Sequence, residues 1–351
     1  MVPSLQILRS PIYLFMFGVI LVSLLMIASF LWYMVSLRNK NARLAARWRE
    51  LEQRWKTSVL ACMMGDETVE KVHGKIMPGE NLFFIDFVRR FAQKVRGIEL
   101  ERLQDLVRPF LDTVATRLST DDEHIRSRAV QTLSVLGIFN YQDMVIPLLN
   151  DPSPLVAMIA ARAIISTLHP DKSKVVLSVM NRFQNWSRGY MANLLAMAGP
   201  GMSPYLREAL EDLNRPDQER VIVADALRFL NDVPSADIVS RLLSKGTGRE
   251  LGATCLRILG SLGGPQHLDV IREQCESEDA IIRVQAIRSL GVHATTEDFK
   301  ILEKALNDDS SWVALQAARS LRQVAGEAHL KALASEYGDK LNLLQQVMAE
   351  A

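Results

Sequence analysis

One helical pattern occurs seven times in the sequence, and this repetition limits the fold more than any other feature. Each segment carries apolar residues at the spacing of one α-helical face, with one apolar position that aligns across all seven. The aligned residues are Leu133, Ile164, Leu195, Leu227, Leu256, Leu290 and Leu321. The successive spacings are 31, 31, 32, 29, 34 and 31 residues. A nearly constant period of this length is typical of a solenoid built from stacked helical units.

Shorter amphipathic stretches between these segments complete each unit as helix, turn, helix. They lie at 142–149, 235–243, 266–275 and 297–306. Aspartates precede four of the longer segments, at Asp122, Asp151, Asp279 and Asp308. Because Asp caps helix N-termini, these residues mark four helix starts. We therefore expect an all-α fold with about seven units between residues 105 and 336.

The repeated residues resemble the HEAT-repeat family, in the short bacterial variety that is also found in bilin lyases. The theme Leu-x-Asp-x4-Val-Arg-x2-Ala-x2-Ala-Leu-Gly is matched best at 149–163, 279–291 and 306–321. The third unit departs from it at Trp186, Tyr190 and the loop 199–204, and the fifth unit departs at 245–248. The resemblance implies a HEAT-type α-solenoid, a superhelix of helix pairs in which the second helices line the concave face.

The N-terminal region contains a long segment without charge. Residues 12–37 are 26 consecutive uncharged residues, enough to cross a hydrocarbon core of about 30 Å. Tyr13 near one end and Trp32-Tyr33 near the other suit the membrane interfaces. A buried soluble helix and a cleaved signal peptide are the alternatives. The length of the segment, and the bulky residues after Ala28-Ser29, favour a single transmembrane helix.

The charges beside this segment predict its orientation. Only Arg9 precedes it, whereas seven basic residues follow it: Arg38, Lys40, Arg43, Arg47, Arg49, Arg54 and Lys56. The positive-inside rule then places the C-terminal side in the cytoplasm, with the basic stretch beside anionic headgroups. Similar layouts in bacteria imply a single-pass protein of the bacterial inner (plasma) membrane with a cytoplasmic solenoid.

A second amphipathic stretch follows the membrane segment. Leu44, Trp48, Leu51 and Trp55 fall on one helical face of residues 40–60. One interpretation is a helix that binds a partner or the membrane surface. The other is a stalk that continues the transmembrane helix and packs its apolar stripe on the solenoid. The two tryptophans favour a contact surface, because Trp is enriched at interfaces.

These observations divide the chain into five parts. They are an N-terminal transmembrane anchor (1–37), a juxtamembrane helix and linker (38–81), an N-terminal helical cap (82–117), the HEAT-repeat solenoid (118–336) and a C-terminal tail or helix (337–351). The cap is rich in aromatic residues, as expected of an atypical terminal repeat.

The composition excludes several kinds of function. The 41 basic and 40 acidic residues nearly balance, which argues against a nucleic-acid binder. Cys62, Cys255 and Cys275 form no CxxC pair, and the six histidines are scattered, so no metal site is predicted. Nucleophile and phosphate-loop motifs are lacking. We therefore expect no catalytic, cofactor-binding or metal-binding residues and no cofactor.

Arginine recurs seven positions before the aligned residue, at Arg126, Arg188, Arg220, Arg249 and Arg283. These residues could form a basic ladder for an acidic partner, or they could pair with turn aspartates of adjacent units. The family resemblance favours the second interpretation.

Other arginines are the candidates for partner contacts. Arg162, Arg288 and Arg319 lie two positions before the aligned residue, and Arg228, Arg257 and Arg322 lie one position after it. With Trp48 and Trp55 they form the predicted partner-binding set. We expect a membrane-anchored scaffold or adaptor that binds unidentified protein partners, in a bacterial envelope or polysaccharide assembly. The alternative is a bilin-lyase-like enzyme or an accessory subunit of a membrane enzyme.

Overall fold

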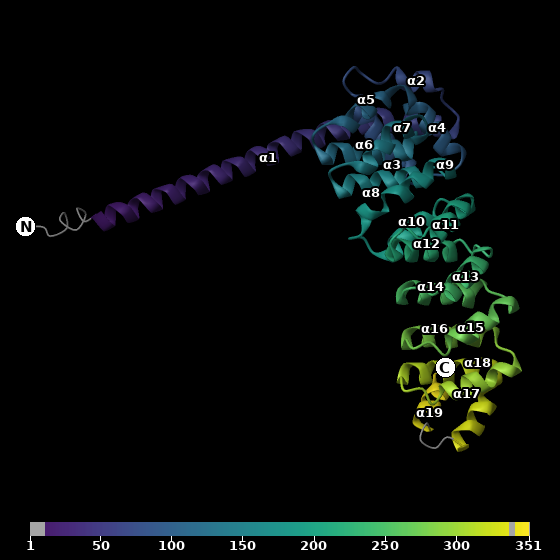
Figure 1. The fold of residues 1–351 in the computed structure, drawn as a ribbon. Helices are drawn as coiled ribbons and strands as arrows, with labels where there is room; N and C mark the ends of the chain where they lie inside the picture. The colour runs from purple at the N-terminus through teal and green to yellow at the C-terminus, as the bar shows by residue number, and fades with distance from the viewer. Residues whose placement is uncertain (1–10, 337–340, 351) are drawn as a thin grey trace, which may run out of the picture. The chain divides into compact units, whose positions relative to one another are not determined.

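The computed structural model describes residues 11–336 and 341–350, with side chains described for 15–334 and 341–350. Every regular element in these ranges is a helix, which confirms the all-α prediction (Figure 1). The chain divides into two compact units, Met1–Val114 and Ala115–Ala351, which are described separately below. Arg9, the side chain of Tyr13 and part of the predicted tail lie outside the described residues.

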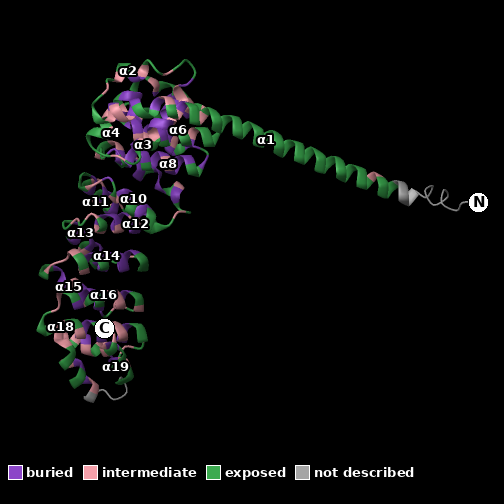
Figure 2. Cartoon of the chain, turned by 180° about the vertical axis from the view of Figure 1, so that it is seen from behind, coloured by how far each residue is buried: buried purple, intermediate pink, exposed green. Residues whose placement is uncertain are grey.

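The first unit begins with one unbroken helix, α1 (Pro11–Met64), of 54 residues. Its most apolar window has a mean hydropathy of 2.4 and is 0% buried, so this helix is long and apolar enough to cross a membrane. Figure 2 shows α1 exposed over its first part. The exposure argues against the alternative of a buried soluble helix. The helix does not break at the predicted boundary between the anchor and the juxtamembrane segment.

The second part of α1 packs against three helices, α2 (Val69–His73), α3 (Asn81–Ala92) and α4 (Ile98–Val107). Leu51, Trp55 and Val59 are fully buried in this contact. The structure thus agrees with the stalk interpretation, in which this stretch continues the N-terminal apolar helix. Its apolar stripe packs on the aromatic-rich cap helices rather than facing a partner.

The predicted linker contains the short helix α2 and joins α1 to α3. Gly65, with φ of 93°, ends α1 in a backbone conformation that favours glycine. The carbonyl of Met63 accepts a hydrogen bond of 2.9 Å from Arg102, and Arg54 pairs with buried Glu80 at 3.1 Å. The linker therefore fastens the end of α1 to the rest of the first unit.

The second unit is an array of helix pairs (Figure 1). The second helices are α6 (Glu123–Leu136), α8 (Pro154–Ile165), α10 (Arg188–Ala196), α12 (Asp217–Phe229), α14 (Arg249–Leu262), α16 (Ala280–His293) and α18 (Ser311–Glu336). The first helices are α7 (Gln142–Val145), α9 (Pro170–Ser173), α11 (Ser203–Glu211), α13 (Ser235–Lys245), α15 (Leu268–Gln274) and α17 (Phe299–Ala305). α5 (Asp112–Ala115) lies at the boundary of the two units. α18 kinks at Gly326, and α19 (Leu341–Ala349) follows.

The predicted caps divide into two kinds. The carboxylates of Asp122 and Asp279 accept backbone N–H bonds from the first turns of α6 and α16, at 2.8 Å from His124 and Ile281. Asp151 and Asp308 lie further from the helices, three residues before α8 and α18 begin, and accept from the backbone N–H groups of Ser153 and Ser310 at 2.8 Å each.

The structure corrects the alignment of the fifth unit. The Ser289 hydroxyl donates to the carbonyl of Leu256 at 2.7 Å, and the Ser320 hydroxyl donates to the carbonyl of Ile287 at 3.1 Å. Leu256 therefore occupies the same place in its unit as Ile287 does in the next. The aligned residue of the fifth unit is Leu259, three positions later, and the two neighbouring spacings become 32 and 31 residues.

Candidate protein-interaction surface

With this corrected register, the second helices of the array present one common face, which we call the second-helix face. It comprises the residues nine before, two before and two after the aligned position, and all of them are exposed or half-buried. The row nine positions before is His124, Leu155, Trp186, Gln218, Glu250, Ile281 and Trp312. The row two positions before is Gln131, Arg162, Asn193, Asp225, Arg257, Arg288 and Arg319. The row two positions after is Val135, Ser166, Met197, Phe229, Ser261, Val292 and Gln323.

Three of the predicted partner-binding arginines come together on this face. Arg257, Arg288 and Arg319 occupy the same position on the consecutive helices α14, α16 and α18, and all three are exposed. We call them the arginine row. Arg162 occupies the same position on α8 and is also exposed, but α10 and α12 lie between it and the row.

Two other predicted arginines have partners within the chain. Arg228 is half-buried, pairs with Asp225 at 3.3 Å and lies 4.7 Å from the ring centre of Phe229. Arg322 is half-buried and donates to the carbonyls of Val347 and Glu350 in the last turn of α19. Both residues stabilise local structure, so they are poorer candidates for partner contacts than the arginine row.

The prediction for Trp55 is wrong, because this side chain is 0% exposed. Its ring meets Phe84 edge-on with centroids 5.2 Å apart, and its Nε1 donates to the carbonyl of Lys75 at 3.3 Å. Trp48 is half-buried between Phe83, at 5.4 Å, and the guanidinium of Arg90, at 4.3 Å. Both tryptophans hold α1 to α3, so the first unit uses them for packing.

The arginines seven positions before the aligned residues mainly hold units together. Arg126 binds Asp151 of the next unit through two hydrogen bonds of 2.7 and 2.8 Å. Arg283 binds Asp308 in the same way, with the same two distances, and Arg249 pairs with Asp279. The structural interpretation is confirmed for these three pairs.

The two remaining arginines of this set pair differently. Arg220 binds Asp217 of its own helix at 3.1 Å, and Arg188 reaches Glu250 at 2.6 Å.

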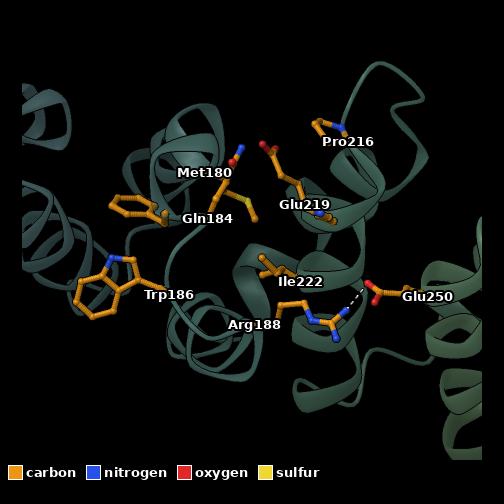
Figure 3. A pocket seen from close by; sticks show the side chains of 10 residues that line it. Met180, Gln184, Trp186, Arg188, Pro216, Glu219, Ile222 and Glu250 are labelled. Atoms are coloured by element: carbon orange, nitrogen blue, oxygen red, sulfur yellow. Dashed lines mark hydrogen bonds and ion pairs between the residues drawn. The ribbon is translucent and has the colours of Figure 1, made fainter.

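A pocket of about 280 Å³ opens at the N-terminal ends of α10 and α12, beside the second-helix face (Figure 3). Met180, Gln184, Glu219 and Ile222 surround it, and the Arg188–Glu250 ion pair crosses its edge. An apolar floor with polar groups around it suits a side chain of a protein partner. The pocket lies between the third and fourth units, beside Trp186, where the sequence departs from the repeat theme.

Exposed apolar side chains also lie on α10 and α12, with Tyr190 in the first turn of α10 and Met197 and Phe229 at the C-terminal ends, away from the pocket. Tyr190 is 37% exposed, Met197 47% and Phe229 39%. Further along the face, Ile281 is 49% and Trp312 72% exposed. Aromatic residues, Met and Arg are enriched where proteins bind one another. Sequence reasoning found the arginines of this face but missed its apolar half, because only the packing shows which apolar residues stay uncovered.

The cysteines are poor nucleophiles. Cys62, Cys255 and Cys275 are buried, free thiols. Burial raises the pKa of Cys255 and of Cys275 to about 12, and burial also raises the pKa of Cys62. All three therefore stay protonated near neutral pH, and thiols in this form react slowly. Within the described residues, no group of three His, Cys, Asp or Glu side chains is arranged to hold a metal ion.

Comparison with known proteins supports the repeat assignment. Residues 238–322, which include α14 and α16, match the family model of HEAT repeats. No curated protein matches the sequence. A crystal structure of a Kap121p mutant is similar with a TM-score of 0.45 and 11% identity, covering 71% of this chain and 34% of that one. This chain thus spans about a third of the length of the Kap121p chain. The family match identifies HEAT repeats at residues 238–322, and the helix pairs on either side of this range continue the same helix–turn–helix pattern.

Proposed function

We propose that this chain is a membrane-anchored scaffold that binds a protein partner through the second-helix face of its HEAT-type repeats. The observation that carries the proposal is the composition of this face, where exposed aromatic and Met side chains lie beside a row of exposed arginines. The enrichment of these residue types at protein interfaces supports a protein partner rather than a small molecule.

The proposed anchor is the first part of α1. Its apolar window is fully exposed, and residues 38–49 after it carry five basic and no acidic side chains, all exposed. Burial of the apolar surface in lipid would remove an otherwise costly exposure to water. The basic segment favours anionic headgroups and a cytoplasmic location for the repeats. The bacterial inner membrane is the setting that the resemblance to single-span bacterial HEAT proteins implies.

Because α1 does not break, it would hold the first unit at a fixed distance from the bilayer. From Leu37 to Leu51, the first fully buried residue, α1 advances by about 20 Å. A partner held at the membrane in this way suits an assembly of envelope or polysaccharide proteins, which is the context we propose.

The bilin-lyase-like enzyme, or accessory subunit, is the alternative that the family resemblance raised. A cysteine-directed reaction would need an accessible thiolate, and burial keeps the three thiols of this chain protonated. This observation supports the scaffold over the alternative.

Site-specific photo-crosslinking of the full chain in its native membrane tests the proposal. We expect a photoreactive amino acid at Met197 or Trp312 to capture a protein, and the same group at Lys300, exposed on a first helix, to capture none. Equal capture from Lys300, or no capture from both face positions, would contradict the proposal. A reporter fused after Ala351 should give a cytoplasmic signal, and a periplasmic signal would overturn the orientation.

A further inference from the structure

Most side chains beside the arginine row are uncharged; the acidic ones are Asp225, at the same position on α12 and paired with Arg228, and Glu350. On one side of the row lie Thr254, Gln285 and Gln316, five positions before the aligned residues; on the other side lie Ser261, Val292 and Gln323. Arg257 donates to the hydroxyl of Thr254 at 2.6 Å, which orients its guanidinium without neutralising it. In the described part of the chain, Arg288 has no ion pair and no hydrogen bond. Arg257 and Arg288 therefore carry positive charge that no ion pair within the described residues balances.

The chain already contains one carboxylate bound at the end of this row. Arg319 donates two hydrogen bonds, of 2.8 and 2.7 Å, to the two carboxylate oxygens of Glu350. Arg322 donates to backbone carbonyls of the same turn of α19. Such a bidentate pair is the geometry in which arginine recognises carboxylates best. The contact shows that Arg319 of the row, with Arg322 beside it, can bind an acidic side chain together with its backbone.

Around Glu350 the structure leaves room for a further acidic group. A cavity of about 560 Å³ is lined by Arg288, Gln316, Arg319, Arg322, Gln323 and Glu350. Three guanidinium groups thus face one carboxylate.

The spacing of the row matches an extended chain. Neighbouring packed helices lie about 8–10 Å apart, so successive arginines repeat at about that interval. A peptide extended in the polyproline II conformation has three residues per turn and advances about 3.1 Å per residue, so every third side chain points to the same side and meets the next helix.

We propose that the arginine row binds an extended acidic segment of the protein partner, with a carboxylate at every third residue. Glu350 occupies the last position of this site in the free chain and competes with the partner. This inference rests on the proposed scaffold function and adds the chemistry of the partner. Leu344 and Val347, which are fully buried, hold α19 on the array whether or not Glu350 is displaced.

Fluorescence anisotropy with the full-length protein in detergent micelles tests the inference. The probe is a fluorescein-labelled 12-residue peptide with Glu at every third position and Ser and Gly between. We expect Arg288→Glu to weaken binding about tenfold or more, because it replaces attraction with repulsion at the centre of the row. The matched control Lys300→Glu, the same charge reversal on a first helix, should bind normally. Glu350→Gln should bind the peptide several-fold more tightly, because it removes the competing carboxylate.

Four results would overturn the inference. The first is an equal loss of peptide binding in Arg288→Glu and Lys300→Glu, and the second is unchanged or weaker peptide binding in Glu350→Gln. The third is that a peptide with the same glutamates clustered binds as tightly as the probe. The fourth is that a single-stranded oligonucleotide of equal charge binds as tightly as the probe. Circular dichroism of Arg288→Glu confirms that the array is folded, which is expected for an exposed position.

The test also separates this inference from the proposed function. Partner crosslinking at Met197 that persists unchanged in Arg288→Glu would reject only the acidic segment. Peptide binding by the row, without partner crosslinking in membranes, would reject the scaffold.

Discussion

The contact between Arg283 and Asp308 should be one of the strongest links between repeats, and Arg283→Ala tests it. Arg283 donates to both oxygens of Asp308 and also to the carbonyls of Ser277 and Glu278, at 2.8 and 3.0 Å. One side chain thus joins the turn before its own helix to the turn of the next unit. The side chains of Arg283 and Asp308 are only 18% and 12% exposed.

The size of the effect follows from this burial. Loss of one partner from a buried ion pair costs about 3–5 kcal/mol, because the other charge is left uncompensated. Asp308 keeps the hydrogen bond of 2.8 Å from the backbone N–H of Ser310, so the lower end of that range applies. We expect about 3 kcal/mol, which corresponds to roughly a hundredfold in the local opening equilibrium.

Hydrogen exchange measured by mass spectrometry reports this opening for each helix. A solenoid unit contacts only its neighbours, so exchange should accelerate in α16 and α18 and stay unchanged in α6 and α8. Arg249→Ala is the control, because Arg249 also pairs with the turn aspartate of the next unit, Asp279, but through one hydrogen bond and with 64% of its side chain exposed. An exposed pair contributes about 1 kcal/mol or less, so the control should accelerate exchange by about fivefold at most.

The reasoning is refuted if the two variants accelerate exchange equally, because burial would then not determine the strength of the link. It is also refuted if Arg283→Ala accelerates exchange in α16 by less than about fivefold, or if the effect reaches α6.

Three further predictions concern acid, the cap and the thiols. Arg283 lowers the pKa of the Asp308 carboxyl. The ion pair therefore stabilises the fold fully above the pKa of about 4 that Asp308 has in the unfolded chain, and this contribution is lost as the pH falls through the lower pKa of the folded protein. Exchange in α18 should accelerate below about pH 4, and Asp308→Asn should abolish this acid-dependent component. Trp55→Ala should destabilise the first unit by about 3–5 kcal/mol, seen as a lower Tm of the full protein, whereas a shift below 1 °C would contradict its packing role. Cys255 and Cys275 should resist iodoacetamide at pH 8 until the protein is unfolded, because burial raises the pKa of each to about 12; labelling of the native protein would show that these thiols are accessible.

The second helices could be predicted well from sequence, because each buries one continuous apolar face with helical spacing. The first helices were predicted less well. The stretch 142–149 becomes a single α-helical turn, α7, followed by a 3₁₀ segment over Ile146–Asn150, because Pro147 cannot donate a backbone N–H bond. The alignment error in the fifth unit has a related cause. Leu256 and Leu259 lie three residues apart on one helical face, so periodicity alone cannot choose between them.

The candidate surface depended more on tertiary contacts. Trp55 lies on an apolar stripe, and this sequence pattern is the same for a core helix and for an interface helix. Only the contacts of Trp55 with Phe84 and Phe87 show that it belongs to the core. The arginine row became visible only after the register of α14 was corrected, which placed Arg257 beside Arg288. Glu350 lies 31 residues from Arg319, and nothing local in the sequence brings them together.

Arginine therefore has two separate roles on the same helices, and position within the helix decides which role applies. Arg283 and Arg288 both lie on α16. Arg283 lies near the start of the helix, where it binds Asp308 of the next unit. Arg288 lies about two turns from the start, where the neighbouring residue of the next unit is Arg319 rather than an acidic residue. The charge of Arg283 is paired inside the array, and this ion pair stabilises the array. The position of Arg288 places like charges on neighbouring helices, which costs stability unless an external anion binds. An array that keeps such a row exposed is best explained by a partner that supplies the missing negative charge.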